Sequence, residues 1–115
     1  MENHLYPDIS KELTQRRKEL APDIYAAFRS FGQRVFGAGA LPEKTKQLIA
    51  IAVAHATQCP YCIRGHTELA VQKGATDEEI MEAIWVAAEM RAGAAYAHSL
   101  LAIDAMKKSR DNAHR

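Results

Sequence analysis

The residues best suited to chemistry are the chain's only two cysteines, Cys59 and Cys62, which are separated by two residues and followed by His66. Pro60 stands between the cysteines, and proline is tolerated in the first turn of a helix. The motif therefore predicts a helix that starts at Pro60, with Cys59 at its cap and Cys62 in its first turn. Unpaired backbone N–H groups and the helix dipole at that end favour thiolate over thiol. Two sulfurs at this spacing can also close a disulfide with little strain.

His66 lies four residues after Cys62, one turn along the same helix face, where its imidazole can accept a proton or pair with a thiolate. An activated thiolate, a second thiol and a base are what peroxide reduction or disulfide exchange requires. Two other interpretations remain open: buried, inert cysteines, or a zinc site made by Cys59, Cys62 and His66 with His55 or His98. Structural zinc typically serves small domains that lack a core, whereas 48% of this chain is hydrophobic. We therefore favour the redox pair, with no metal.

Four more side chains are candidates for a relay or a pocket around the cysteines. Gln47 and His55 share one face of a predicted helix that leads toward the cysteine turn, and Tyr61 stands between the cysteines. His98 lies in a run of small residues near the C-terminus. For His55 and His98, each taken alone, we favour a packing role over a catalytic one. No organic cofactor is expected, because the chain has no glycine-rich phosphate-binding loop.

The elements that must position these residues are helices. The 115 residues include 21 alanines, the best helix former, and glycine and proline fall at the predicted joints. We expect one compact all-α domain over residues 1–115, a bundle of about six helices. The first four predicted helices span residues 10–20, 23–36, 41–58 and 60–73. A fifth begins at the capping box of Thr76 and Glu79 and ends at a break or tight bend at 91–95. A last helix follows and runs through about residue 108. The fifth helix is expected to turn Ile80, Met81, Ile84 and Ala88 inward.

Composition excludes several classes of function. Fifteen basic and fourteen acidic residues leave a net charge of +1, which is no footprint for nucleic acid or an anionic membrane. The longest apolar stretch, 48–56, is about half of the roughly 20 residues that a bilayer span needs. The N-terminus has no secretory signal pattern, so we expect a cytoplasmic protein. Helices this rich in alanine have more apolar face than one small domain can bury, which predicts a homo-oligomer.

The stretch from Leu41 to His66, LPEKTKQLIAIAVAHATQCPYCIRGH, resembles the carboxymuconolactone decarboxylase family, specifically its alkyl hydroperoxidase D-like branch. The resemblance covers roughly residues 20–106. It implies an all-helical domain that assembles into trimers, or into hexamers built from three dimers. It also implies a peroxiredoxin-like oxidoreductase that acts on a small hydroperoxide or disulfide and is reduced again by a dithiol.

The resemblance assigns roles residue by residue. Cys62 matches the thiol that attacks peroxide, Cys59 the thiol that resolves the product to a disulfide, and His66 the proton-relay histidine. The chain departs from the family at Gln47, where a relay glutamate is usual twelve residues before the first cysteine. Glutamine cannot take up a proton at neutral pH, so a histidine must supply the base, or peroxide turnover is weak.

Two functions follow as expectations of different kinds. The first is a thiol-dependent peroxidase or disulfide oxidoreductase. The alternative is a non-enzymatic oligomeric protein that senses redox state or binds a partner, with the cysteine pair as a slow switch. We do not expect the decarboxylation of a muconolactone, because the branch with that activity generally lacks the cysteine pair.

Overall fold

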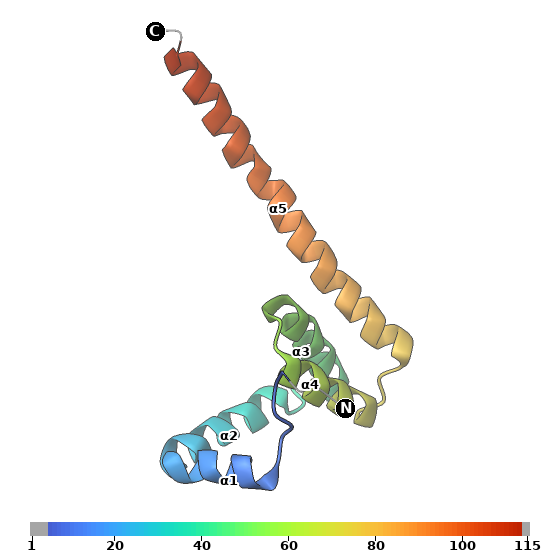
Figure 1. Ribbon diagram of the computed structural model, residues 1–115. Coiled ribbons are helices and arrows are strands. Elements are labelled where there is room, and N and C mark those ends of the chain that lie inside the picture. The colour runs from blue at the N-terminus through green and yellow to red at the C-terminus, as the bar shows by residue number, and fades with distance from the viewer. Residues whose placement is uncertain (1–4, 114–115) are drawn as a thin grey trace. The chain divides into compact units, whose positions relative to one another are not determined.

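The computed structural model describes residues 5–113, and these residues form α-helices joined by short turns, with no strand among them (Figure 1). The all-α prediction is confirmed. Five helices are present in this range where about six were expected: α1 (Lys11–Leu20), α2 (Pro22–Phe36), α3 (Glu43–Thr57), α4 (Pro60–Gln72) and α5 (Asp77–Ala113). They fall into two compact units, one ending at Gly37 and one beginning at Ala38.

The first unit contains α1 and α2. The Ser10 side chain caps α1 by accepting a hydrogen bond of 3.2 Å from the Leu13 N–H, at the predicted start. Pro22 is the first residue of α2, one residue before the predicted start. Neither helix contains a buried residue, and on α2 the apolar Phe28 is 72% exposed. The apolar side chains that recur at helical spacing along α2 are exposed: Ile24, Phe28, Phe31 and Val35.

The second unit has a small core at which α3 packs against α4 and the first part of α5. Ile51 of α3 and Ala70 of α4 are fully buried, and Ile80 of α5 completes the cluster. Alanine at the buried positions lets the helix backbones approach closely. Partly buried residues surround this cluster: Leu48, Ala75 and Ile84. The core therefore joins the three helices that carry the candidate side chains, with Cys59 at the N-cap of α4.

Local signals set the ends of these helices. Gly74 has a φ of 90°, a conformation that L side chains rarely adopt, and it follows α4 as the predicted stop. The predicted capping box also forms: the Thr76 N–H donates to Glu79 Oε1 at 2.9 Å, and the Glu79 N–H donates to Thr76 Oγ1 at 3.1 Å. Glu79 Oε2 pairs in addition with Lys44 Nζ at 3.0 Å, which ties the start of α5 to α3.

The break predicted at residues 91–95 is absent, and α5 is one continuous helix of 37 residues. Alanines on both sides of Gly93 explain the continuity, because a single glycine costs only about 1 kcal/mol relative to alanine and there is no proline to interrupt the hydrogen bonds. The predicted fifth and last helices are therefore merged into one.

The inward face of α5 differs in part from the prediction. Ile80 and Ala87 are buried and Ile84 is half-buried, as expected for residues at a spacing of three and four. Met81 and Ala88, which were predicted to face inward, are exposed. The buried stripe is narrow because only α3 packs against this helix to any extent.

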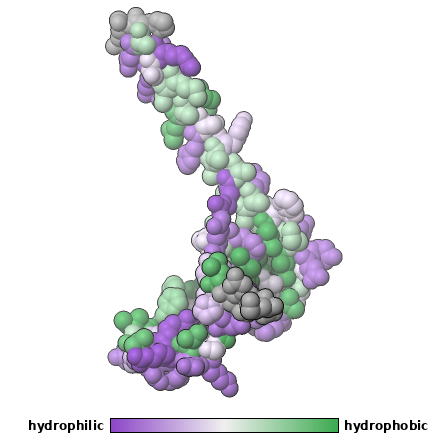
Figure 2. All heavy atoms as spheres, in the orientation of Figure 1, coloured by the Kyte–Doolittle hydropathy of each residue, from purple (hydrophilic) through white to green (hydrophobic). Residues whose placement is uncertain are grey.

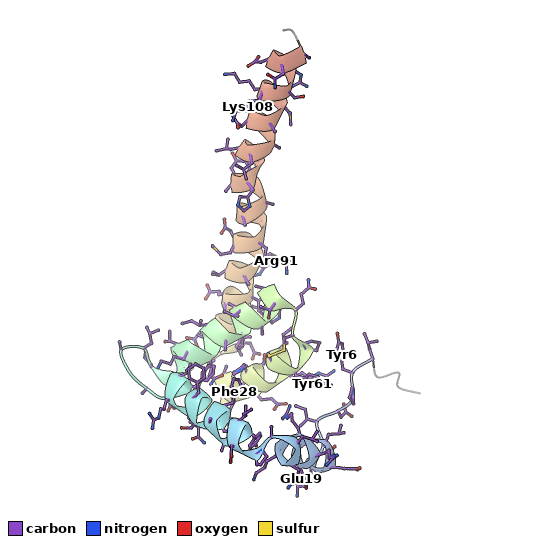
Figure 3. All side chains as sticks on the ribbon, turned by 90° about the vertical axis from the view of Figure 1, so that its left-hand side faces the viewer. Tyr6, Glu19, Phe28, Tyr61, Arg91 and Lys108 are labelled. Atoms are coloured by element: carbon purple, nitrogen blue, oxygen red, sulfur yellow. A yellow bond between two sulfur atoms is a disulfide. The ribbon has the colours of Figure 1, made fainter. Side chains whose placement is uncertain are left out.

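Beyond Arg91, which Figure 3 labels, α5 projects from the α3–α4 pair without another helix beside it (Figures 1 and 3). At 1.5 Å per residue the remaining part is about 33 Å long. Hydrophobic spheres continue along this projecting segment (Figure 2). Its large apolar side chains are exposed, and Tyr96 is 82% exposed. These side chains are Tyr96, Leu100, Leu101, Ile103 and Met106. Across residues 5–113, no helix combines the length and the apolar character needed to span a membrane.

Candidate functional site

Cys59 and Cys62 form a disulfide at the N-terminus of α4 (Figure 3). Pro60 is the first helical residue, Cys59 is the N-cap, and the Cys62 N–H donates to Cys59 Sγ at 3.3 Å. Their Cα atoms lie 5.3 Å apart, within the range that disulfides ordinarily span. Both residues are half-buried. The structure thus contains the oxidised pair at the helix position that the sequence predicted.

Contacts with α3 and α5 hold the turn that carries the disulfide. Gln58 ends α3 in the left-handed conformation, with a φ of 57°, and redirects the chain so that the Cys59 N–H donates to the Ala54 carbonyl at 3.0 Å. Arg91 of α5 donates from Nη1 to the Ala56 carbonyl at 2.8 Å, which satisfies an otherwise unpaired group at the end of α3. The role of Arg91 could not be predicted from the sequence, because nothing local marks an arginine that bonds a backbone carbonyl 35 residues away.

His66 and Gln47 meet across the α3–α4 interface. Gln47 is only 4% exposed, and its Oε1 accepts a hydrogen bond of 2.8 Å from His66 Nδ1. A carbonyl oxygen can only accept, so Nδ1 carries the proton and Nε2 holds the lone pair of the neutral ring. Burial lowers the pKa of His66 below its ordinary value of 6.5, because desolvation disfavours the imidazolium. Near neutral pH this side chain is an uncharged base one helical turn after Cys62.

The other predicted side chains occupy three different settings. Tyr61 is half-buried in the first turn of α4, beside the disulfide in Figure 3. His55 is half-buried on α3, and its Nδ1–H donates to the Ile51 carbonyl one turn earlier at 2.8 Å. His98 is exposed on the projecting part of α5, seven residues beyond Arg91, and is not among the residues gathered around the cysteines.

The zinc interpretation requires several ligands to converge. Among residues 5–113 no group of three or more His, Cys, Asp or Glu side chains is placed to hold a metal ion. The two sulfurs are bonded to each other, and His66 Nδ1 donates to an amide. This arrangement suits two-electron thiol chemistry: a sulfur pair that opens and closes, at a helix end that favours the thiolate, with a base on the same face.

The shifted pKa of His66 predicts a pH dependence of stability. Because the folded protein binds this proton less tightly than the unfolded chain, His66 contributes stability that is present above pH 6.5 and is lost as the pH falls from 6.5 through the folded pKa. We expect the urea midpoint to fall between pH 7.5 and 5, and to fall less in His66→Asn. His98→Asn, at an exposed position, is the control, and its urea midpoint should change with pH as that of the wild type does. Identical pH slopes for wild type and His66→Asn would contradict the assignment.

Comparison with known proteins identifies relatives that cover most of the described helices. The sequence model of the carboxymuconolactone decarboxylase family matches residues 22–105. An uncharacterized protein of the cox locus of Paracoccus denitrificans is 67% identical over 73 residues, which make up 64% of this chain and 66% of that protein, just under two thirds of its length. An uncharacterized protein of Cupriavidus necator is 31% identical over 103 residues, covering 83% of this chain and 91% of that protein.

Solved structures extend the similarity to three dimensions. A carboxymuconolactone decarboxylase family protein from Legionella pneumophila superimposes with a TM-score of 0.63 at 43% identity, covering 69% of this chain and 70% of that one. A family member from Thermotoga maritima, described with a proposed involvement in an antioxidative response, gives a TM-score of 0.53 at 29% identity and covers 70% of this chain and 92% of that one. The chain belongs to the carboxymuconolactone decarboxylase family.

Proposed function

We propose that this protein is a thiol-dependent peroxidase and disulfide oxidoreductase that reduces small hydroperoxides through Cys59 and Cys62. The observation that carries the proposal is the disulfide at the start of α4, with a neutral imidazole one turn further along. The antioxidative role proposed for the Thermotoga maritima relative agrees with it. We infer a cytoplasmic location, where cellular dithiols can reduce the pair again.

The reaction begins from the reduced pair. The Cys62 thiolate attacks the terminal oxygen of the hydroperoxide, so that an S–O bond forms and the O–O bond breaks. The alkoxide leaves as an alcohol after taking a proton, and Cys62 becomes a sulfenic acid. The Cys59 thiol then attacks the Cys62 sulfur, the S–O bond breaks, and water leaves as the disulfide forms. A dithiol returns two electrons by thiol–disulfide exchange and is itself oxidised to a disulfide.

His66 and the end of α4 have distinct roles in this scheme. His66 accepts the proton that activates the Cys62 thiol, since its Nε2 is the ring nitrogen without a proton. The dipole and unpaired N–H groups at the start of α4 favour the thiolate form of Cys62, and the Cys62 N–H itself donates to the sulfur of the resolving residue, Cys59. Neither role requires a metal or an organic cofactor.

A thiol titration tests this proposal. The anaerobically reduced wild type should carry two free thiols, because the chain has two cysteines, and one equivalent of a small hydroperoxide should leave none. Mass spectrometry should find a loss of two hydrogen atoms and no added oxygen, as a disulfide requires. Thiol counts that stay at two after peroxide addition would overturn the proposal.

Gln47 favours a second candidate, a redox switch that is oxidised once and turns over slowly. An amide stands where the relay of this family's peroxidases usually has a carboxylate, and it cannot accept a proton. Steady-state peroxide consumption with a dithiol separates the two candidates. A wild-type rate near zero together with a large gain in Gln47→Glu would support the switch, whereas sustained wild-type turnover would exclude it.

We further propose that the protein acts as a homo-oligomer, a trimer or a hexamer of three dimers. Tyr96, Leu100 and Ile103 follow one another at spacings of four and three and line one face of the projecting part of α5. Between residues 92 and 106 this segment has a single charged side chain, Asp104. Since a continuous exposed apolar face marks an interaction surface, a second copy of the chain is the partner that we propose for this face.

A further inference from the structure

We propose that Gln47 is a positioning residue that holds His66 in the tautomer with its proton on Nδ1, so that Nε2 is the single base of the cysteine pair. The role of His66 as a base rests on the proposed thiol chemistry, whereas the hydrogen bond between Gln47 and His66 does not depend on it. Its starting point is one contact between two helices, the 2.8 Å hydrogen bond between Gln47 Oε1 on α3 and His66 Nδ1 on α4.

The contact is well suited to fixing a tautomer. Gln47 is buried, and a buried carbonyl oxygen requires a donor. Because that oxygen can only accept, the ring nitrogen facing it must carry the hydrogen, and in the neutral ring the lone pair then belongs to Nε2. The ring is also oriented by this bond, since Nδ1 is tied to α3 while the backbone of His66 is part of α4.

An amide at this position has a consequence that a carboxylate would not have. A carboxylate would stabilise the imidazolium and could exchange a proton with Nδ1, which would make the two groups a relay. The amide does neither, so a proton taken from the thiol stays on His66 until it is released to the leaving alkoxide or to solvent. Burial lowers the pKa of His66, because desolvation disfavours the imidazolium.

Imidazole nitrogen spectra test the tautomer directly. In ¹⁵N-labelled protein at pH 7.5, the long-range ¹H–¹⁵N pattern of His66 should be that of a neutral ring with a protonated Nδ1. His55 is an internal reference, because its Nδ1 donates to a backbone carbonyl that no side-chain substitution removes. A wild-type spectrum with the His66 proton on Nε2 would overturn the proposal without any variant being made.

Variants then test whether Gln47 is the cause. Gln47→Met keeps a similar shape without the acceptor, so the Nδ1–H pattern of His66 should be lost while that of His55 remains. Peroxide-driven disulfide formation should slow about tenfold. This is the lower end of the loss found when a residue that orients a metal-bound histidine is removed. Gln47→Glu restores an acceptor and should restore the Nδ1–H pattern. Gln72→Met, at an exposed glutamine of α4, is the matched control and should change neither readout.

The outcomes separate this inference from the proposed function. Retention of the wild-type His66 pattern in folded Gln47→Met protein would overturn the positioning role, even if peroxide still oxidises the cysteines. Conversely, a protein that shows the expected tautomer but keeps both thiols after peroxide treatment would lose the proposed function and retain the positioning role. Far-ultraviolet circular dichroism establishes that each variant is folded.

Discussion

Cys62→Ser protein is expected to consume hydroperoxide at least about a thousandfold more slowly than the wild type, the scale of loss when a nucleophile is removed. A serine hydroxyl at this position cannot become the anionic nucleophile at neutral pH, and no sulfenic acid can form there. Stopped-flow measurement of peroxide consumption by the prereduced variant is the test. Wild-type kinetics in Cys62→Ser would exclude Cys62 as the attacking thiol.

Cys59→Ser protein serves as the matched variant, because it removes the resolving thiol and leaves the attacking one. We expect a single turnover in which one equivalent of peroxide is consumed and Cys62 remains as a sulfenic acid that a dimedone probe traps at that residue. Catalytic turnover with a dithiol should be lost, since no intramolecular disulfide can form. The reverse pattern, with trapping at Cys59 in the Cys62→Ser protein, would exchange the two assigned roles.

Leu100→Glu is expected to convert the proposed oligomer into monomers. Leu100 is 70% exposed on the projecting part of α5, in the face that we propose to be covered by a second copy. Burying a leucine contributes about 1.5–3 kcal/mol, and an unpaired charge in the same place opposes association further. The substitution should therefore weaken assembly by about a hundredfold or more, which light scattering at micromolar concentration detects as a fall toward the 12.8 kDa mass of one chain.

Asn112→Glu is the control for this prediction, because it places the same charge on the same helix at an exposed polar position near the end of the described chain. Its mass should equal that of the wild type. Two results would contradict the assembly proposed for α5: a wild type that is monomeric at micromolar concentration, or a Leu100→Glu protein that keeps the wild-type mass. Either result would leave the chemistry of the cysteine pair untouched.

Features that depend on neighbouring residues could be predicted from the sequence. The start of α4 at Pro60, the cap at Cys59 and the end of the helix before Gly74 all follow from local backbone chemistry: a missing N–H, an unpaired N–H group and a positive φ. The capping box at Thr76 has the same origin. Such bonds join residues within one turn of each other, so the residue types alone specify them.

The continuity of α5 was not predictable in this way. A glycine among alanines is compatible with either a bend or a continued helix, because the difference of about 1 kcal/mol is small compared with what packing contributes. The break predicted at residues 91–95 is therefore wrong, and α5 continues through it. The same limit applies to Met81, whose exposure depends on how much of the helix another element covers.

The residues of the candidate site also differ in whether nearby residues or tertiary packing determine their positions. The sequence by itself determined the helical class, the helix end that carries Cys59 and Cys62, and the position of His66 one turn later, because all of these are set by contacts within a few residues. Only the tertiary structure decided that His66 bonds to Gln47, nineteen residues earlier on another helix, and that His98 lies elsewhere. Packing of α3 against α4 brings those side chains together, and packing depends on the whole core rather than on any local pattern.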